Sequence, residues 1–159
     1  MPTFTSPSDG VSLHYRIYTP NTAPKPLTLV FLHGWPMSAR MWEHLMPTFV
    51  LTNHFRCIAP DRRGFGRSDW ATKDSGVISW DVFVGDLAGL LEEFGVQEFV
   101  FVASSMGCTE SLLAYQRSEF IQKRCKVCFP LFPFYDLHYF PQPDTSRRVG
   151  NKAHDAKGE

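Results

Sequence analysis

The stretch FVFVASSMGCTES, Phe99–Ser111, decides the fold because it joins an apolar run to a helical pattern through two serines. The apolar run over Glu98–Ala103 predicts a buried strand, and the spacing over Met106–Ser118 predicts a helix. A sharp turn between a strand and a helix can hold its central side chain clear of the backbone. Ser105 is therefore the candidate nucleophile of this chain.

Small residues stand two positions before and after Ser105, at Ala103 and Gly107, as a strained turn requires. Ser105 would lie at a helix N-terminus, where free amides and the helix dipole favour negative charge. We therefore expect the amide of Met106 to stabilise an oxyanion. Serine is also a common helix N-cap, so this stretch alone leaves open a purely capping role for Ser104 or Ser105.

The rest of the chain up to residue 126 alternates strand and helix patterns. β-forming apolar runs predict strands, and apolar residues at helical spacing predict helices, one of them with Ser79 as its N-cap. This alternation predicts an α/β fold with a mainly parallel sheet flanked by helices. Besides the two elements around Ser105, we expect strands at 11–18, 27–32 and 55–59, and helices at 39–50 and 79–94.

The composition narrows the class of protein. Hydrophobic residues make up 43% of the chain and charged residues 20%, as in one globular domain. Sixteen basic and sixteen acidic residues balance, so we expect neither nucleic acid nor a membrane as a partner. The sequence shows no signal-peptide pattern and no membrane-spanning run, and its four cysteines suit reduced thiols. We therefore expect a cytoplasmic protein.

One pair of cysteines, Cys125 and Cys128, forms a CxxC motif. It has neither a second pair nor nearby histidines, which metal sites of this type normally contain. The motif therefore does not by itself predict a metal or redox site.

Three motifs follow one another in the chain: HGWP at 33–36, DRRGFGRSD at 61–69 and ASSMG at 103–107. Each follows a predicted buried strand. Together they resemble the α/β-hydrolase superfamily, particularly its cofactor-independent haloperoxidase and esterase-like branch. The usual elbow pattern is G-x-S-x-G, and this chain has alanine at the first glycine. The resemblance implies a serine hydrolase of small ester or acyl substrates, with no cofactor and no metal.

The resemblance also implies a role for each matching residue. Ser105 is the nucleophile, and the backbone amides of Trp35 and Met106 form the oxyanion hole. Epoxide hydrolases and haloalkane dehalogenases resemble this chain but carry aspartate at the nucleophile, so serine favours ester, lactone or C–C cleavage. The residues that shape the two loops are His33, Gly34 and Gly107. A structural network is expected from Asp61, Arg62, Arg63 and Asp69.

The acid and base of a catalytic triad are not present at the expected positions. In this superfamily they follow the serine, after later strands. Only His138 and His154 follow Ser105, one in a proline-broken segment and the other in a polar tail. Neither follows a buried strand, so we expect weak or no activity. The earlier histidines His14, His44 and His54 match no role in the family.

The composition changes after Lys126, where residues 127–143 contain four phenylalanines and four prolines. We predict a partial α/β-hydrolase domain over 1–126 and a non-family, disordered tail over 127–159. Pro130 and Pro133 cannot sit in a central strand, so strand 98–103 is expected to become an open edge. Such an edge favours an alternative function, a non-catalytic binding or dimerising module that self-associates through it.

Overall fold

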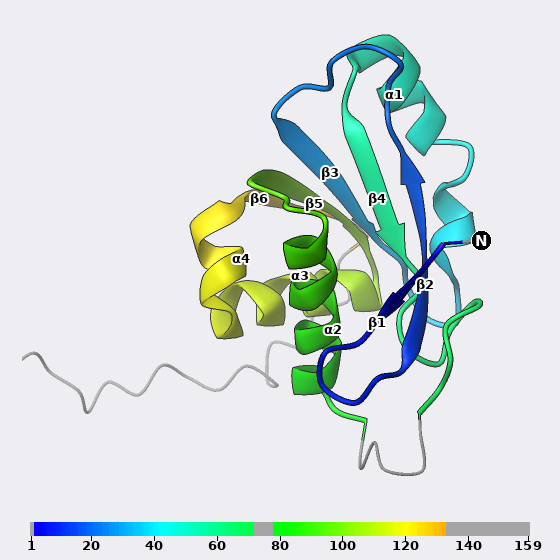
Figure 1. Ribbon diagram of the computed structural model, residues 1–159, viewed down its shortest axis with the longest axis vertical. Coiled ribbons are helices and arrows are strands. Elements are labelled where there is room, and N and C mark those ends of the chain that lie inside the picture. The colour runs from blue at the N-terminus through cyan, green and yellow to red at the C-terminus, as the bar shows by residue number, and fades with distance from the viewer. Residues whose placement is uncertain (1, 72–77, 133–159) are drawn as a thin grey trace, which may run out of the picture.

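A computed structural model describes residues 2–71 and 78–132 of the chain. They form one sheet of six strands in the order β1-β2-β4-β3-β5-β6 (Figure 1). Strands β3 to β6 run parallel, whereas β2 is antiparallel to β4 and β1 is antiparallel to β2. The predicted α/β class with a mainly parallel sheet is confirmed. The strands are β1 Thr3–Thr5, β2 Ser12–Tyr18, β3 Leu27–Leu32, β4 Arg56–Pro60, β5 Glu98–Ser104 and β6 Cys125–Phe132.

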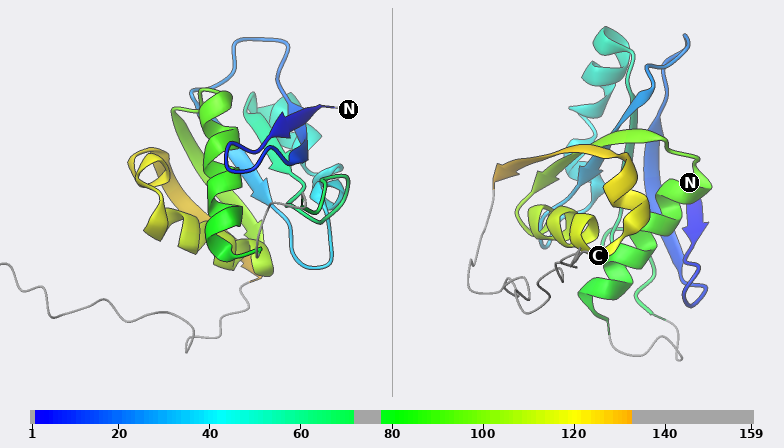
Figure 2. Two further views of the ribbon diagram at one scale, coloured as in Figure 1. Left: turned by 60° about the horizontal axis from the view of Figure 1, so that its bottom comes forward. Right: turned by 90° about the vertical axis from the view of Figure 1, so that its left-hand side faces the viewer.

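Helices cover both faces of the sheet (Figure 2). One apolar cluster lies between the sheet and the helices α2, α3 and α4. A second, smaller cluster lies between the opposite face and the segment that holds η1 and α1. The helices are the 3₁₀ turn η1 Ala39–Trp42, α1 Met46–Asn53, α2 Trp80–Glu93, α3 Met106–Arg117 and α4 Glu119–Arg124.

Strand β3 explains why its sequence is a continuous apolar run. Val30 and Leu32 lie in the larger cluster, whereas Leu29 and Phe31 lie in the smaller one. Side chains alternate between the two faces of a strand, so a strand covered on both faces needs apolar residues at every position.

The predicted helix over 39–50 is wrong as a single element. The chain forms η1, capped by the Ser38 side chain, and then α1 begins at Met46. Pro47 lies in the first turn of α1, where its missing amide hydrogen costs no helical hydrogen bond. The proline therefore marks the start of a separate helix. The helix after Ser79 is confirmed, since the Ser79 hydroxyl accepts a hydrogen bond from the Val82 amide.

The expectation that β5 becomes an open edge is also wrong. Strand β6 pairs with β5 in parallel, and Pro130 lies within it opposite Ala103. Among the described residues β6 is the last strand of the sheet, and an edge strand tolerates proline because half of its amides face away from its neighbour. Pro133 and the rest of the predicted tail lie outside the described residues. The domain boundary after Lys126 stays a prediction.

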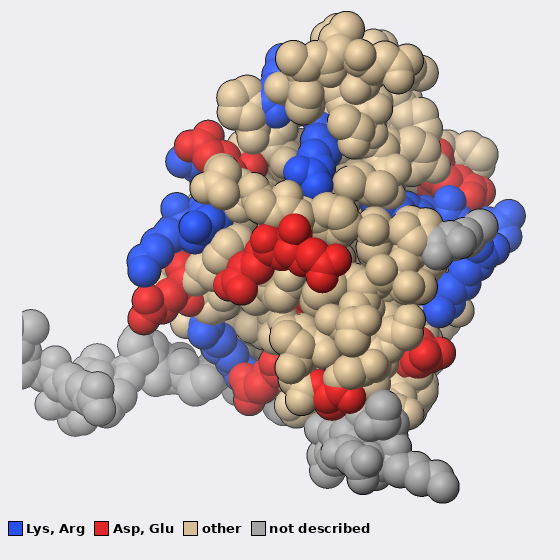
Figure 3. All heavy atoms as spheres, viewed as in Figure 1, with Lys and Arg blue, Asp and Glu red and all other residues tan. Residues whose placement is uncertain are grey.

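The surface carries mixed charge. Figure 3 shows basic and acidic side chains interspersed over one face. No helix of the described part is long and apolar enough to cross a membrane.

Candidate active site

Ser105 occupies a strained turn between β5 and α3. Its backbone has φ 51° and ψ −119°, a left-handed conformation that costs a non-glycine residue about 1–3 kcal/mol. The side chain is half-buried and makes no capping hydrogen bond to α3. Ser105 thus stands at the N-cap position without using its hydroxyl as a cap, which leaves the oxygen free for another role.

Two glycines bring the loop after β3 against this turn. A Cβ atom on Gly107 would lie 2.5 Å from the carbonyl oxygen of Leu32, so the start of α3 packs directly on the end of β3. A Cβ atom on Gly34 would lie 3.0 Å from Cβ and 3.6 Å from Oγ of Ser105. Ala103, which replaces the usual first glycine, is 1% exposed in the larger apolar cluster, where its methyl group is accommodated.

The two predicted oxyanion amides flank this contact. Met106 is the first residue of α3, so its amide has no partner within the helix. Trp35 follows Gly34 directly, and within the described residues its amide donates no hydrogen bond. The indole of Trp35 is 69% exposed, so only the backbone of this residue is placed by the core. The catalytic roles of both amides stay predictions.

His33 holds the loop that follows β3, and its imidazole is neutral. Its Nδ1 donates to the Gly34 carbonyl at 2.8 Å, and its Nε2 accepts the Arg62 amide at 3.0 Å. Burial, together with the positive charge of Arg62, lowers the pKa of His33 to about 4. Both ring nitrogens are engaged, which suits the loop-shaping role expected for this residue and leaves neither nitrogen free to deprotonate Ser105.

Residues 28–151 match the sequence family described as alpha/beta hydrolase fold. The chain belongs to the α/β-hydrolase fold family. The fold and the strand-turn-helix geometry at Ser105 agree with this assignment.

Relatives of this α/β hydrolase differ in the activities that their names state. The chain is 38% identical to a bifunctional esterase/perhydrolase of Acinetobacter calcoaceticus, over 65% of this chain and 35% of that protein. It is 30% identical to epoxide hydrolase 1 of Siraitia grosvenorii, over 87% of this chain and 39% of that protein. The fold also matches the structure of a bromoperoxidase from Bacillus anthracis, with a TM-score of 0.65 and 30% identity. The match covers 80% of this chain and 43% of the bromoperoxidase chain. The chain thus spans less than half of each of these proteins.

Gly107→Ala tests the contact between the elbow and β3 in this α/β hydrolase. The added methyl group would meet backbone atoms that cannot move independently, so we expect a loss of about 1–3 kcal/mol in the free energy of unfolding. Gly85→Ala is the matched control, since a Cβ atom there meets nothing within 4 Å inside α2 and should stabilise the chain by about 0.5–1 kcal/mol. Urea denaturation of both variants measures the difference. Equal stabilities would contradict the close approach at Gly107.

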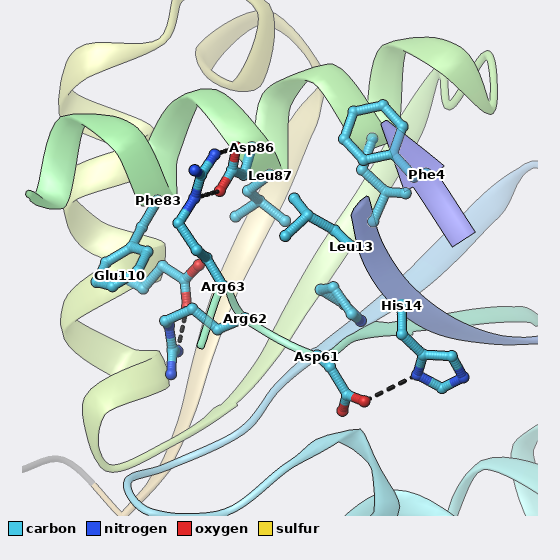
Figure 4. Close-up of a pocket in the computed structure, with 12 residues that line it drawn as sticks. Phe4, Leu13, His14, Asp61, Arg62, Arg63, Phe83, Asp86, Leu87 and Glu110 are labelled. Carbon is cyan, nitrogen blue, oxygen red and sulfur yellow. Dashed lines mark hydrogen bonds and ion pairs between the residues drawn. The ribbon is translucent and has the colours of Figure 1, made fainter. Parts of the chain in front are cut away.

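Asp61 is one member of the predicted loop network, and Figure 4 shows its contact with His14. Its carboxylate accepts the Ala39 amide at 2.7 Å and the Arg67 amide at 3.0 Å, and it contacts Nδ1 of His14 at 2.8 Å. A Cβ atom on Gly66 would lie 2.4 Å from this carboxylate, so only glycine fits there. Asp61 therefore joins β2, η1 and its own loop. The pairing of Asp61 with His14 was not predicted from the sequence, because the two residues lie on different elements.

Arg62 connects the same loop to the helix that follows the elbow. Its Nε donates to Glu110 of α3 at 3.0 Å, and its Nη2 donates to the His33 carbonyl at 3.1 Å. Burial raises the pKa of Glu110, and the positive charge of Arg62 opposes that shift. Glu110 was not predicted, since a single acidic residue in a helical pattern gives no sign of a buried partner.

Arg63 is the least exposed charged residue in the described part of the chain, with a side chain that is 0% exposed. Its guanidinium donates to Asp86 of α2 at 2.9 Å and to Asp9 at 3.0 Å. These bonds raise the pKa of Arg63, so it stays charged throughout the usual pH range. Asp69 joins the network through its backbone, which bonds Gly64 and Ser12.

A cavity of about 20 Å³ lies within this network, lined by residues that include His14, Asp61 and Glu110. That volume holds about one water molecule and excludes an organic substrate. The cavity is therefore part of the structural network and not a substrate site.

None of the histidines in the described ranges hydrogen-bonds to Ser105. His14 and His33 have the partners given above, His44 is exposed beside Glu43, and His54 bonds Thr22 at 3.0 Å. His138 and His154 lie outside the described residues. Over residues 2–71 and 78–132 no cluster of three metal-ligating side chains occurs.

Proposed function

We propose that this α/β hydrolase carries out acyl transfer at Ser105 and cleaves a small ester or a related acyl substrate. The observation that carries the proposal is the positive-φ turn that sets an uncapped Ser105 at the start of α3 and against Gly34. Such a turn costs free energy, and strained turns of this kind are typical of functional sites.

The proposed reaction begins when Oγ of Ser105 attacks the substrate carbonyl. The resulting oxyanion would accept hydrogen bonds from the amides of Trp35 and Met106, and such donors typically contribute about 3–4 kcal/mol each to the transition state. Loss of the leaving group gives an acyl-enzyme, which water then hydrolyses. Serine supports this route because an aspartate would instead form an alkyl ester, as epoxide opening requires.

None of the described residues is placed to remove the proton from the hydroxyl of Ser105. Without a base, a serine triad retains only about 10³–10⁴-fold acceleration over water, which comes from the oxyanion hole and binding. We therefore propose weak activity for this chain. The similarity to an esterase/perhydrolase supports acyl transfer as the reaction class. This chain matches only 35% of that protein, so the activity of a protein of the relative's full length stays a proposal.

Imidazole in solution tests this proposal. With an aryl acetate as substrate, the rate of phenolate release by the wild-type chain should rise with imidazole concentration more steeply than the rate of Ser105→Ala. The reason is that imidazole can take the proton from Ser105 only where the serine exists. Stopped-flow absorbance measures both rates, and subtraction of the protein-free reaction removes catalysis by imidazole alone. Identical slopes for the two proteins would contradict acyl transfer at Ser105.

A second function, non-catalytic self-association through the sheet edge, is favoured by one observation. Val127 and Phe129 on β6 are 51% and 56% exposed, and β6 is the last strand among residues that the structure describes. Apolar side chains on such a strand are a ready surface for another chain. A folded protein that leaves the ester untouched at every imidazole concentration would favour this second function.

A further inference from the structure

The two cysteines of the CxxC motif lie side by side at the start of β6. Sγ of Cys125 is 3.9 Å from Sγ of Cys128. Cys125 is also the C-cap residue of α4, so the pair stands where a helix turns into the sheet. The sequence motif alone does not predict a site, and the distance between the sulfurs is what the structure adds.

A bulge in β6 brings the two thiols together. Phe99 of β5 pairs with Cys125, and the next residue of β5, Val100, pairs with Val127. Lys126 is therefore an extra residue on the β6 side of the ladder. In a regular strand, residues three apart point to opposite faces, and one extra residue returns both cysteines to the same face.

The pair is open to small molecules. Both cysteines are half-buried and line a surface hollow of about 270 Å³ together with Leu112 and Tyr115 of α3. The other two cysteines, Cys57 and Cys108, are 0% and 1% exposed. Only the CxxC thiols can therefore meet a reagent in the folded chain.

The two thiols are also unequal in reactivity. The hydrogen bond from Cys125 lowers the pKa of Cys128 to about 7, burial opposes that shift, and a hydrogen bond from Ser111 assists it. The same bond, together with burial, raises the pKa of Cys125. Burial likewise raises the pKa of Cys57, to about 12, so the lowered pKa of Cys128 differs from both. Cys128 is thus the more acidic of the two thiols, and the thiolate is the nucleophilic form.

We propose that Cys125 and Cys128 form a redox-active dithiol that a small disulfide of the glutathione class oxidises to an intramolecular disulfide. Cys128 attacks one sulfur of the reagent, whose S–S bond breaks and releases one thiolate. Cys125 then loses its proton to solvent and attacks the sulfur of Cys128, which releases the second thiolate. The chain loses two electrons and two protons in total, and the reagent becomes two thiols. The sulfurs must approach by about 2 Å to reach bonding distance.

Peptide mapping of the wild-type chain tests this proposal directly. The folded protein is equilibrated in glutathione buffers of increasing potential, acid-quenched, alkylated, unfolded and cut with trypsin. Trypsin cleaves after Arg124 and after Lys126, so the two cysteines end in different peptides. The expected result is a pair of linked peptides, lighter by two hydrogens than their sum, that appears with a single midpoint potential. Two separately alkylated peptides at every potential would overturn the proposal. A disulfide that forms only when the chain is unfolded in urea would overturn it too.

Single variants test the order of attack. Cys125→Ser should leave Cys128 able to form a lasting mixed disulfide with glutathione. Cys128→Ser should react several-fold more slowly at pH 7, since Cys125 is the less acidic thiol. Equal rates in the two variants would overturn the assignment of Cys128 as the attacking group. The wild-type mapping needs no variant, so it decides the proposal even where a variant folds poorly, and neither experiment depends on the chemistry of Ser105.

Discussion

Arg63→Met is expected to cost the chain a large part of its stability, because it removes the buried guanidinium that pairs with Asp86 and Asp9. The Arg63 side chain is 0% exposed, and the side chains of its two partners are 14% and 9% exposed. Removal of one member of a buried ion pair typically costs about 3–5 kcal/mol. Small domains have only about 5–15 kcal/mol of stability, so this loss removes a large share of it. Urea denaturation followed by circular dichroism measures the change.

Arg117→Met is the matched control for that variant. Arg117 also pairs with an aspartate on α2, at 2.6 Å from Asp81, but the two side chains are 36% and 77% exposed. A surface pair of this kind contributes about 0–1 kcal/mol. A loss at Arg63 no larger than the loss at Arg117 would contradict the structural role of the network. Asp86→Asn should partly restore the Arg63→Met protein, since it removes the charge of the buried carboxylate that has lost its guanidinium partner.

The parts of the fold that depend on local pattern could be predicted from the sequence. The apolar run of β3 predicts a strand covered on both faces, and Ser79 predicts the start of α2. The elbow is also readable, because small residues around Ser105 are what a strained turn needs. In each case the cause lies within a few residues of the feature.

The parts that depend on contacts between distant segments could not be predicted. His14 pairs with Asp61 across 47 positions and Arg62 pairs with Glu110 across 48, and no local signal links them. The network of the DRRGFGRSD loop was expected as a structural feature, but its partners on other elements, such as His14, Glu110 and Asp86, were not. One sequence cannot show which charges will be buried together.

Two errors came from proline. Pro47 lies inside the predicted helix 39–50, where a proline within the first turn instead marks the start of a separate helix. Pro130 cannot sit in a central strand, but the prediction of an open edge at β5 overlooked that an edge strand such as β6 tolerates it. The bulge at Lys126 was hidden for a different reason, since it depends on the register between β5 and β6.

Ser105→Ala is expected to abolish covalent labelling by a fluorophosphonate, a reagent that phosphonylates activated serines. The folded wild-type chain should take up one label per molecule, at Ser105, because Oγ makes no capping hydrogen bond and the amides of Trp35 and Met106 can stabilise the developing charge. With no base among the described residues, the reaction should take hours. Ser104→Ala is the matched control, since Ser104 is 8% exposed within β5 and should not affect the label.

The most direct measurement is therefore intact-mass analysis of these three proteins after exposure to the fluorophosphonate, with a cooperative melt recorded for each. The account predicts one label on the wild type and on Ser104→Ala and none on Ser105→Ala. A folded wild-type chain without label, or a Ser105→Ala chain that keeps it, would contradict the assignment of Ser105 as the nucleophile.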